Sequence, residues 1–372
     1  ASGDTTGRDA MKLKILGATA IAGAIAAIGL SATAAPGGDA KLQSAGALAF
    51  APNGVLLIGD SAAGQVVAVE TGDTAKAAAG KVEVADLSAK IAALLGTTAD
   101  QVAVNDVAVN PASGSVYISV SRGLGPQAAP VILKADRAGK LTEVKVETLK
   151  RSSVALSDAP APDAKNARGQ AIRQEAITDL GYVNGQVLVA GLSNEEFASS
   201  MRTIAYPFAS GAKGASIEMY HGAHGQFETA APVRTFMTYD VAGKPNVLAA
   251  YTCTPLVKIP VDQFKAGAKI KATTIAELGN RNRPLDMIAY KKDGRDFILM
   301  ANSARGVMKL DAAKLESYPN IATPIADKAG VPYETIAELQ GVTQLDKVDE
   351  TSAVIVVAAA DKSTSLKTIA LP

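Results

Sequence analysis

Short apolar segments separated by tight polar turns recur along the chain from about residue 45 onward. The same unit appears six times: an apolar segment, a turn, and a second segment rich in Val, Ile and Leu. Asn53-Gly54, Asn184-Gly185 and Asp293-Gly294 form three of the turns. Asn-Gly and Asp-Gly favour hairpins because their backbones accept the positive φ of type I′ turns. The pattern predicts six β-hairpins, at residues 47–58, 104–120, 177–189, 234–250, 285–300 and 342–357.

Further apolar segments follow most of these hairpins. Units of four short strands that repeat at roughly 40 to 70 residues are typical of propeller blades. We therefore expect an all-β fold, a six-bladed β-propeller that forms a single domain over residues 35–372, in preference to a pair of β-sandwiches. The predicted third strands are 65–69, 131–134, 306–310 and 366–369, and the predicted fourth strands are 81–84, 143–146, 216–219 and 274–278.

The sixth unit ends after its third strand. We expect residues 36–44 to supply the missing outer strand, because pairing the two ends of the chain removes an exposed sheet edge. Residues 86–96 predict a helix with an aspartate at its start and a glycine at its end. Residues 151–175 show no periodicity, and a connection of this length is typical of a functional lid or a disordered loop.

The N-terminal residues differ from the rest in pattern. A basic segment beginning at Met11 precedes an uncharged apolar run over 15–30, and Ala32-Thr33-Ala34 supplies the small residues of a cleavage site. This order is typical of a secretory signal peptide, and the run is shorter than the roughly 20 residues that span a bilayer. We therefore expect a signal over 11–34, residues 1–10 upstream of it, a periplasmic or secreted protein, and no stable membrane insertion after cleavage.

The composition of the chain narrows the classes of partner that we expect. The chain carries 37 Lys and Arg against 36 Asp and Glu, so no strong basic surface is expected and nucleic acid is not an expected partner. Cys253 is the single cysteine, which excludes an internal disulfide. A small molecule or a protein is the expected partner.

In a four-stranded blade, the start of the first strand and the end of the second lie at the same end. Asp106, Asp179 and Asp286 occupy matching places at that end of three units. They predict a ring of carboxylates around the channel that coordinates a hard cation such as calcium. Alternatively, each aspartate caps backbone amides at the start of its own strand.

Both histidines of the chain, His221 and His224, lie in one predicted connection between blades on the same face. With Met219 and Cys253 expected nearby, they are suitable ligands for copper or zinc. The alternatives are that the histidines only form hydrogen bonds within their loop, and that Cys253 is a small buried side chain at a strand end.

Arginines also gather at this end. Arg281, Arg283 and Arg305 predict either an anion-binding cluster or structural salt bridges with the aspartates. Glu228 and Asn302 are further candidate ligand-binding residues on this face. The chain contains no Gly-x-Ser-x-Gly elbow, P-loop or His-Glu-x-x-His motif.

The segment from Phe50 to Asp60, followed by Gly64 to Val69, resembles the repeat of the six-bladed superfamily that includes the NHL-repeat proteins and the SMP-30/gluconolactonase-like lactonases. The resemblance implies the propeller fold. It also implies, for the lactonases, a glutamate metal ligand at the start of the first blade, where this chain has Ala45-Gly46-Ala47.

The expected function is therefore that of an exported binding or scaffolding propeller with a ligand or a divalent metal ion on the face carrying His221 and His224. The alternatives are a metal-dependent, lactonase-like hydrolase and a periplasmic redox protein that carries copper.

Overall fold

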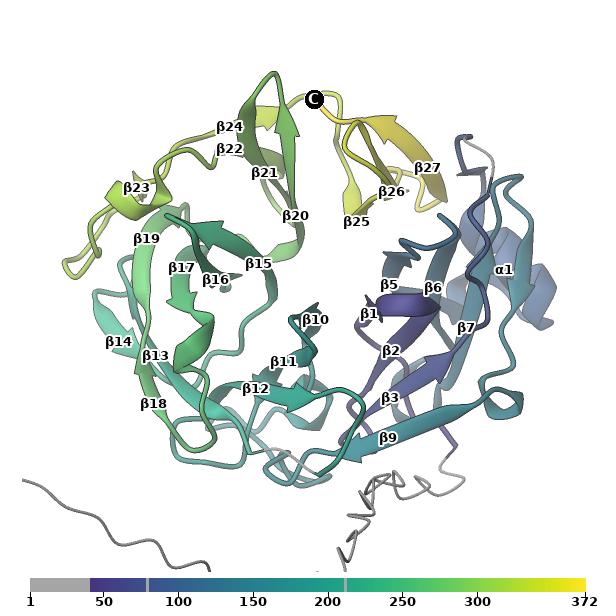
Figure 1. Cartoon of the computed structure of the whole chain (residues 1–372), viewed down its shortest axis with the longest axis horizontal. Helices are drawn as coiled ribbons and strands as arrows, with labels where there is room; N and C mark the ends of the chain where they lie inside the picture. Colours follow the sequence, from purple (N-terminus) through teal and green to yellow (C-terminus); the bar gives the residue numbers. More distant parts are fainter. Residues whose placement is uncertain (1–40, 78–79, 211–212) are drawn as a thin grey trace, which may run out of the picture. The chain divides into compact units, whose positions relative to one another are not determined.

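A computed structural model of the protein describes residues 41–77, 80–210 and 213–372. These residues form six β-sheets arranged around a central channel, so the predicted six-bladed propeller is confirmed (Figure 1). Each of the six predicted hairpins forms the first two strands of one blade. The predicted signal segment, 11–34, lies outside the described residues.

The blades are numbered here by the order in which their hairpins occur in the chain. The first blade contains β1 (Leu48–Ala51), β2 (Val55–Asp60), β3 (Gln65–Glu70) and β9 (Arg151–Ala155). The second contains β5 (Val102–Val109), β6 (Val116–Arg122), β7 (Ala129–Ala135) and β8 (Leu141–Glu143). The third contains β10 (Asp179–Val183), β11 (Gln186–Leu192), β12 (Ser199–Ala205), β13 (Ala215–His221) and β14 (Gln226–Glu228), with β18 (Lys269–Lys271) paired to β13.

The other three blades follow the same plan. The fourth contains β15 (Thr235–Val241), β16 (Lys244–Ala250), β17 (Pro255–Pro260), β19 (Thr273–Leu278) and β23 (Lys328–Gly330). The fifth contains β20 (Pro284–Lys292), β21 (Arg295–Asn302), β22 (Gly306–Asp311) and β24 (Tyr333–Ile336). The sixth contains β25 (Val342–Lys347), β26 (Ser352–Ala358), β27 (Thr364–Ala370) and β4 (Glu83–Val84).

Within residues 41–77, 80–210 and 213–372, helical structure is limited to one α-helix and short 3-10 turns. The predicted helix is confirmed as α1 (Leu87–Leu95), and it ends at Gly96, whose φ of 65° is the left-handed conformation that glycine accepts readily. Asp86 precedes the helix without a capping hydrogen bond from its side chain; the amide of Ser88 instead donates to Thr364 of β27 at 2.9 Å. The 3-10 turns are Pro52–Gly54, Ala99–Gln101, Gly125–Gln127, Val146–Thr148, Arg173–Glu175, Val261–Gln263 and Leu315–Ser317.

The blades do not follow one another around the ring in chain order. Buried apolar clusters join the first blade to the second and to the third, and the second blade to the sixth. Other clusters join the third to the fourth, the fourth to the fifth, and the fifth to the sixth. The order around the ring is therefore second, first, third, fourth, fifth, sixth, as the colours in Figure 1 also show.

This exchange of the first two blades corrects two predictions. Residues 81–84 were expected to complete the first blade, but β4 pairs with β27 and completes the sixth. The first blade is completed by β9, which pairs with β3 and lies in the stretch expected to be a structureless loop over 151–175. Both strands are short and are separated in the sequence from their partners by at least one other blade, so no local repeat in the sequence reveals them.

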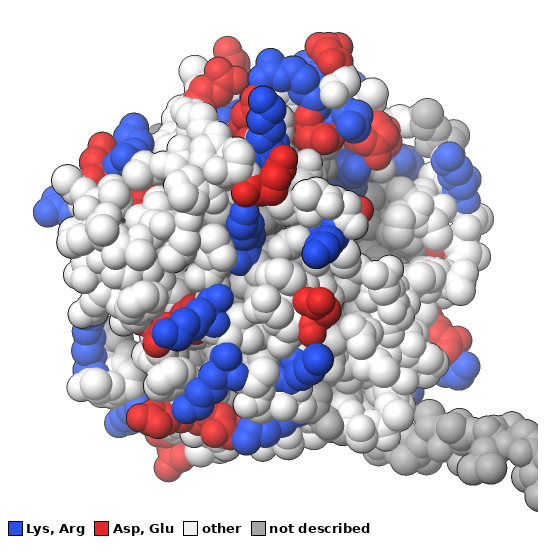
Figure 2. All heavy atoms as spheres, turned by 60° about the vertical axis from the view of Figure 1, so that its left-hand side comes forward, with Lys and Arg blue, Asp and Glu red and all other residues white. Residues whose placement is uncertain are grey.

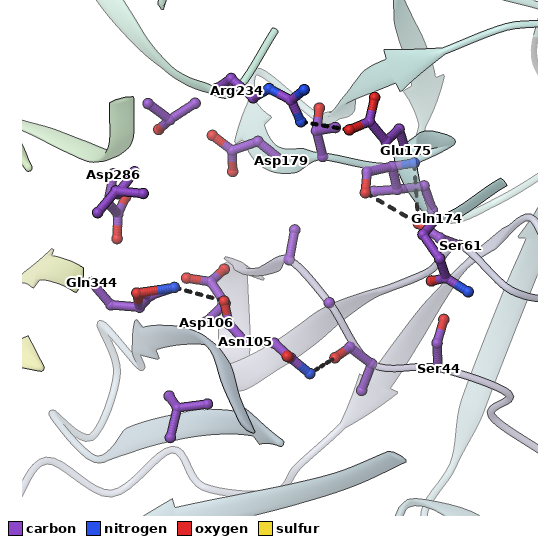
Figure 3. A pocket seen from close by; sticks show the side chains of 18 of the residues that line it. Ser44, Ser61, Asn105, Asp106, Gln174, Glu175, Asp179, Arg234, Asp286 and Gln344 are labelled. Atoms are coloured by element: carbon purple, nitrogen blue, oxygen red, sulfur yellow. Dashed lines mark hydrogen bonds and ion pairs between the residues drawn. The ribbon is translucent and has the colours of Figure 1, made fainter. Parts of the chain in front are cut away.

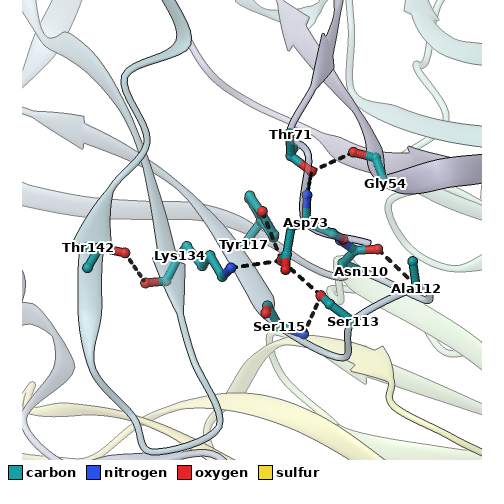
Figure 4. A network of polar contacts seen from close by, with 10 residues as sticks. All are labelled: Gly54, Thr71, Asp73, Asn110, Ala112, Ser113, Ser115, Tyr117, Lys134 and Thr142. Atoms are coloured by element: carbon teal, nitrogen blue, oxygen red, sulfur yellow. Dashed lines mark hydrogen bonds and ion pairs between the residues drawn. The ribbon is translucent and has the colours of Figure 1, made fainter. Parts of the chain in front are cut away.

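A network around Asp73 fixes the segment that crosses the second blade (Figure 4). Its carboxylate accepts hydrogen bonds from Ser113 at 2.8 Å and Tyr117 at 3.1 Å, and forms an ion pair with Lys134 at 2.9 Å. Burial raises the pKa of Asp73, but Lys134 and the serine hydroxyls outweigh this and hold the pKa below its usual value. The segment is therefore held against the second blade on its way to the sixth.

The expectation that residues 36–44 close the sixth blade is wrong for the part that the structure describes. The amides of Gln43 and Ser44 donate to the buried carboxylate of Asp60, at 3.0 and 2.9 Å, at the end of β2. This part of the chain is thus attached to the first blade. Within the described residues, no helix is long and apolar enough to cross a membrane. On the side shown in Figure 2, basic and acidic side chains are interspersed.

Candidate metal centre and channel mouth

The β13–β14 hairpin carries both histidines. Its register places His221 opposite Gln226 and Met219 opposite Glu228, so the side chains of Met219, His221 and Glu228 leave the same face of the hairpin. His224 lies in the turn, where its amide donates to the carbonyl of His221 at 3.1 Å. The two imidazole rings lie 3.8 Å apart between centroids, with 41° between their planes.

The carboxylate of Glu228 bridges the two imidazoles. Its Oε1 lies 2.5 Å from Nδ1 of His224, and its Oε2 lies 3.1 Å from Nδ1 of His221, an ion-pair distance without hydrogen-bond alignment. Burial raises the pKa of Glu228, but the two histidines outweigh burial and lower the pKa to about 2. A carboxylate on Nδ1 fixes the tautomer in which Nε2 keeps its lone pair, which is the common arrangement of histidines that bind metals.

Cys253 reaches this cluster from a strained turn between β16 and β17. Cys253 and Thr254 have φ of 63° and 59°, and the left-handed region is rare for residues other than glycine, above all for a β-branched one. The amide of Cys253 donates to the carbonyl of Asn282 at 2.7 Å, and the Thr254 hydroxyl donates to the carbonyl of Gly279 at 2.7 Å. These contacts hold the turn in its strained conformation.

One ligand atom each from His221, His224 and Cys253 lies within 4.8 Å of the other two. The chain contains two histidines and one cysteine, so all of its imidazole and thiol groups meet at this point. His221 is 2% exposed, and neither of its ring nitrogens has a hydrogen-bond partner among the described residues. An unsatisfied buried polar atom costs about 1–3 kcal/mol, and a metal ion on Nε2 would remove that cost.

Glu277 of β19 adds a buried carboxylate beside the histidines. It is 1% exposed, its Oε1 accepts the amide of Gly222 at 2.5 Å, and its Oε2 has no hydrogen-bond partner among the described residues. Burial raises the pKa of Glu277, although Gly222, His221 and His224 act in the opposite direction. The cluster therefore offers two imidazoles and a thiol, with a buried carboxylate next to them that is not among the ligand atoms within 4.8 Å of one another.

The aspartates that sequence analysis singled out lie on the innermost strands and join neighbouring blades. Each carboxylate accepts the amide of the following residue on one oxygen and an amide of the adjacent blade's innermost strand on the other. The capping alternative is thus confirmed and extended, while the calcium site stays a prediction. The contacts, of 2.7 to 2.9 Å, are Asp106 with Val107 and Leu48, Asp179 with Leu180 and Phe236, and Asp286 with Met287 and Leu345. Asp346 of the sixth blade, which was not predicted, makes two contacts of the same kind at 2.7 Å, with Lys347 and Val109.

A polar cavity of about 470 Å³ opens at the channel mouth (Figure 3). All six blades contribute to its lining, and Asp106, Asp179 and Asp286 lie between this cavity and a second one of about 410 Å³ inside the channel. Burial raises the pKa of Asp179 to about 7 and that of Asp346 to about 6, and the charge of Asp346 adds to the shift of Asp179. Burial and neighbouring aspartates also hold the pKa values of Asp106 and Asp286 above their usual range.

The three predicted arginines are dispersed. Arg283 lines the channel mouth, whereas Arg281 and Arg305 do not. Within the described part of the chain, none of the three forms an ion pair, so the expected salt bridges with the aspartates are absent there. Asn302 is 4% exposed; its Oδ1 accepts from Asn282, the residue whose carbonyl binds the Cys253 amide. Asn302 therefore stabilises the cysteine turn indirectly, through Asn282.

Sequence analysis missed several residues of these two sites. Asp346 lies two residues beyond Gln344, which takes the matching place of Asp106 and Asp286 in the sixth unit, so the alignment of the hairpins did not mark it. Arg234, which pairs with Glu175 at 2.8 Å, was predicted as the first residue of a strand and directly precedes β15, as Arg283 precedes β20. Glu277 lies within an apolar strand, where its charge alone marked it as unusual.

No protein-family model matches the chain, and no curated protein resembles it in sequence. Among solved structures, the extracellular region of plexin A4 matches with 8% identity and a TM-score of 0.42, over 89% of this chain and 40% of that one. Native arabinanase from Bacillus subtilis matches with 14% identity and a TM-score of 0.37, over 69% of this chain and 90% of that one. A glycoside hydrolase engineered at its active site matches with 14% identity and a TM-score of 0.37, over 73% and 51%. Similarities this low support no conclusion about function.

Proposed function

We propose that this protein is an exported, metal-binding β-propeller, and that His221, His224 and Cys253 hold a single copper or zinc ion. The observation that carries the proposal is the convergence of these three side chains from a hairpin and a separate strained turn, with their ligand atoms within 4.8 Å of one another. A turn with a purely structural role does not require a cysteine in the left-handed conformation. A requirement that the thiol face two imidazoles accounts for the cysteine at this position.

Two imidazoles and a thiolate form a ligand set that suits copper and zinc better than hard cations such as calcium. With copper, two histidines and one cysteine in a trigonal arrangement are typical of electron-transfer sites, and the half-exposed His224 offers a route to a redox partner. With zinc, Glu277 or water would complete a tetrahedral shell. In both cases Glu228 is a positioning residue, since its carboxylate binds Nδ1 of His224, lies 3.1 Å from Nδ1 of His221 and leaves each Nε2 for the metal.

The experiment is metal analysis of the purified protein, followed by titration with Cu²⁺ and Zn²⁺. We expect one ion per chain, loss of stoichiometric binding in Cys253→Ser and His221→Ala, and unchanged binding in Thr252→Ser, a conservative change in the same turn. An absorption band and an EPR signal with Cu²⁺ would identify copper chemistry. Equal metal content in the wild type and both ligand variants would refute the proposal.

Glu228→Gln tests the bridging carboxylate separately. Because the variant keeps the shape but not the charge, we expect roughly 10- to 100-fold weaker metal binding at unchanged stoichiometry, as for other carboxylates behind metal-bound histidines. Gln226→Ala, an exposed change in the same strand, serves as the control. Equal affinities of both variants and the wild type would show that Glu228 does not position the histidines.

Export rests on the predicted signal over 11–34, and we propose that the mature chain begins at Ala35. N-terminal mass spectrometry of the exported protein tests this, and a product that retains Met11 would contradict it. We do not extend the proposal to lactone hydrolysis, because Ala45-Gly46-Ala47 stand where the lactonases have their glutamate ligand.

A further inference from the structure

We infer that the channel mouth is a second, independent site, which binds a small zwitterion of the amino acid or dipeptide class, with the ligand carboxylate on Arg283 and its ammonium group on the ring of Asp106, Asp179 and Asp286. The cavity of about 470 Å³ lies within the range of small-molecule sites. It differs from the metal centre in every residue that acts on the ligand.

The rim of the cavity supplies positive charge. Arg234 donates to Glu175 at 2.8 Å and to the hydroxyl of Thr252 at 3.2 Å, so it is largely committed to the protein. Arg283, in contrast, has no side-chain hydrogen bond or ion pair within the described residues. Although Arg283 is exposed, partial burial and the like charge of Arg234 lower its pKa. A bound carboxylate would relieve this repulsion and match the paired donors of the guanidinium group.

The floor supplies acceptors and carboxyl groups whose ionised form a bound cation would stabilise. Figure 3 shows Asp106, Asp179 and Asp286 directing their carboxylates into the space at the centre of the ring. Gln344, which also lines the cavity, donates its amide to the carbonyl of Asn105 at 2.7 Å, while its buried Oε1 has no partner among the described residues. An ammonium group has three donors and no acceptor, so it suits a floor of this composition.

The rim and the floor of the cavity together select the class of ligand. A simple anion would meet Arg283 but would disfavour ionisation of the aspartates, whose pKa values are already raised, and a simple cation would leave Arg283 unpaired beside Arg234. A zwitterion satisfies both ends at once. Since the floor is built by carboxylates already tied to backbone amides, the site is rigid before binding.

The experiment is a screen of the twenty free amino acids and of glycyl dipeptides by thermal shift, with calorimetry on the tightest binder. We expect at least one to bind, and its N-acetyl and carboxamide forms to bind at least tenfold more weakly, because each lacks one of the two charges. Arg283→Gln should weaken binding of the parent compound at least tenfold and leave copper and zinc binding unchanged. Arg281→Gln, an arginine two residues away and outside the cavity lining, is the matched control and should bind as the wild type does.

Asp179→Asn should also weaken binding, and Arg283→Gln keeps the test decisive if that variant does not fold. The inference is overturned if no amino acid or dipeptide binds at millimolar concentration, or if the N-acetyl form binds as well as the parent. It is also overturned if Ca²⁺ alone raises the melting temperature and abolishes amino acid binding in the wild type and in Arg283→Gln alike, which would make the floor a cation site.

Discussion

A few residues of this propeller have a backbone conformation or a degree of burial that their residue types do not favour. Cys253 and Thr254 are consecutive residues in the left-handed region, and Glu277 and His221 place polar atoms without partners in a buried position. Such features raise the energy of the folded state and are retained at sites where the strain serves a purpose. Sequence analysis identified the histidines because they are rare in the chain. It placed Cys253 near them but favoured a packing role, because backbone strain leaves no mark in the residue types.

The strain at Cys253 predicts a separation of stability from metal binding. The left-handed conformation costs an L-residue about 1–2 kcal/mol, which glycine avoids. In the presence of a chelator, Cys253→Gly should therefore be about 1 kcal/mol more stable than Cys253→Ala, which lacks the thiol but keeps the strain. Urea unfolding of both variants measures the difference. A less stable glycine variant would mean that the turn is not strained.

The raised pKa of Asp179, about 7 against an ordinary 3.8, predicts a pH dependence. Between these values the folded protein binds more protons than the unfolded chain, so stability falls as pH rises through this window and levels off above it. Asp346 of the sixth blade also raises this pKa, while hydrogen bonds from Phe236, Leu180 and Thr235 act in the opposite direction. The wild type should melt higher at pH 5 than at pH 7.5, and Asp179→Asn should show a smaller difference. Identical slopes would assign the effect to other groups.

At the scale of elements, the hairpins were predictable and their outer partners were not. Each hairpin is a local pairing whose turn residues and apolar pattern appear together in the sequence. In contrast, β4 has two residues, and its pairing with β27 joins positions more than 280 residues apart, as the hydrogen bond between Val82 and Thr368 shows. β9 was missed because its residues are mostly polar and belong to a blade already left behind in the chain. A short edge strand contributes little apolar pattern, so only the structure reveals which sheet it completes.

The role of β4 predicts an asymmetry between two adjacent residues. Val84 is 1% exposed in the cluster that joins the second and sixth blades, whereas Glu83 is exposed. Val84→Ala should lower the free energy of unfolding by about 1–3 kcal/mol through loss of buried apolar volume. Glu83→Ala should change it by less than about 0.5 kcal/mol. Chemical denaturation of the two variants decides, and equal effects would contradict the pairing of β4 with the sixth blade.

At the scale of the whole molecule, the number of blades was predictable from the repeat, but their order around the ring was not. The exchange of the first two blades depends on the segment near Asp73 that crosses the second blade, and its hydrogen bonds join polar residues that look like ordinary turn residues in the sequence. The channel mouth depends on this order, because each part of its lining comes from a different blade.

Removal of β27 tests the closure of the ring. A chain that ends at Ala358 leaves β4 without a partner and β26 paired with β25 alone, so β4 and the outer edge of β26 become open to solvent. We expect loss of a single cooperative melting transition and aggregation through the exposed edges. Calorimetry with light scattering is the measurement, and an unchanged transition would show that closure is dispensable.

The exchanged blade order also bears on the time course of synthesis. The first 45 or so residues that the structure describes contain strands of both the first and the sixth blade, yet β9 emerges later and β27 last. The first blade can be completed once β9 has been made, but the sixth blade cannot be completed before β27, and pairings between distant segments form slowly. The ring of a nascent chain therefore stays open until β27 has been made, which is the condition in which a polypeptide can still be threaded through a narrow translocation pore.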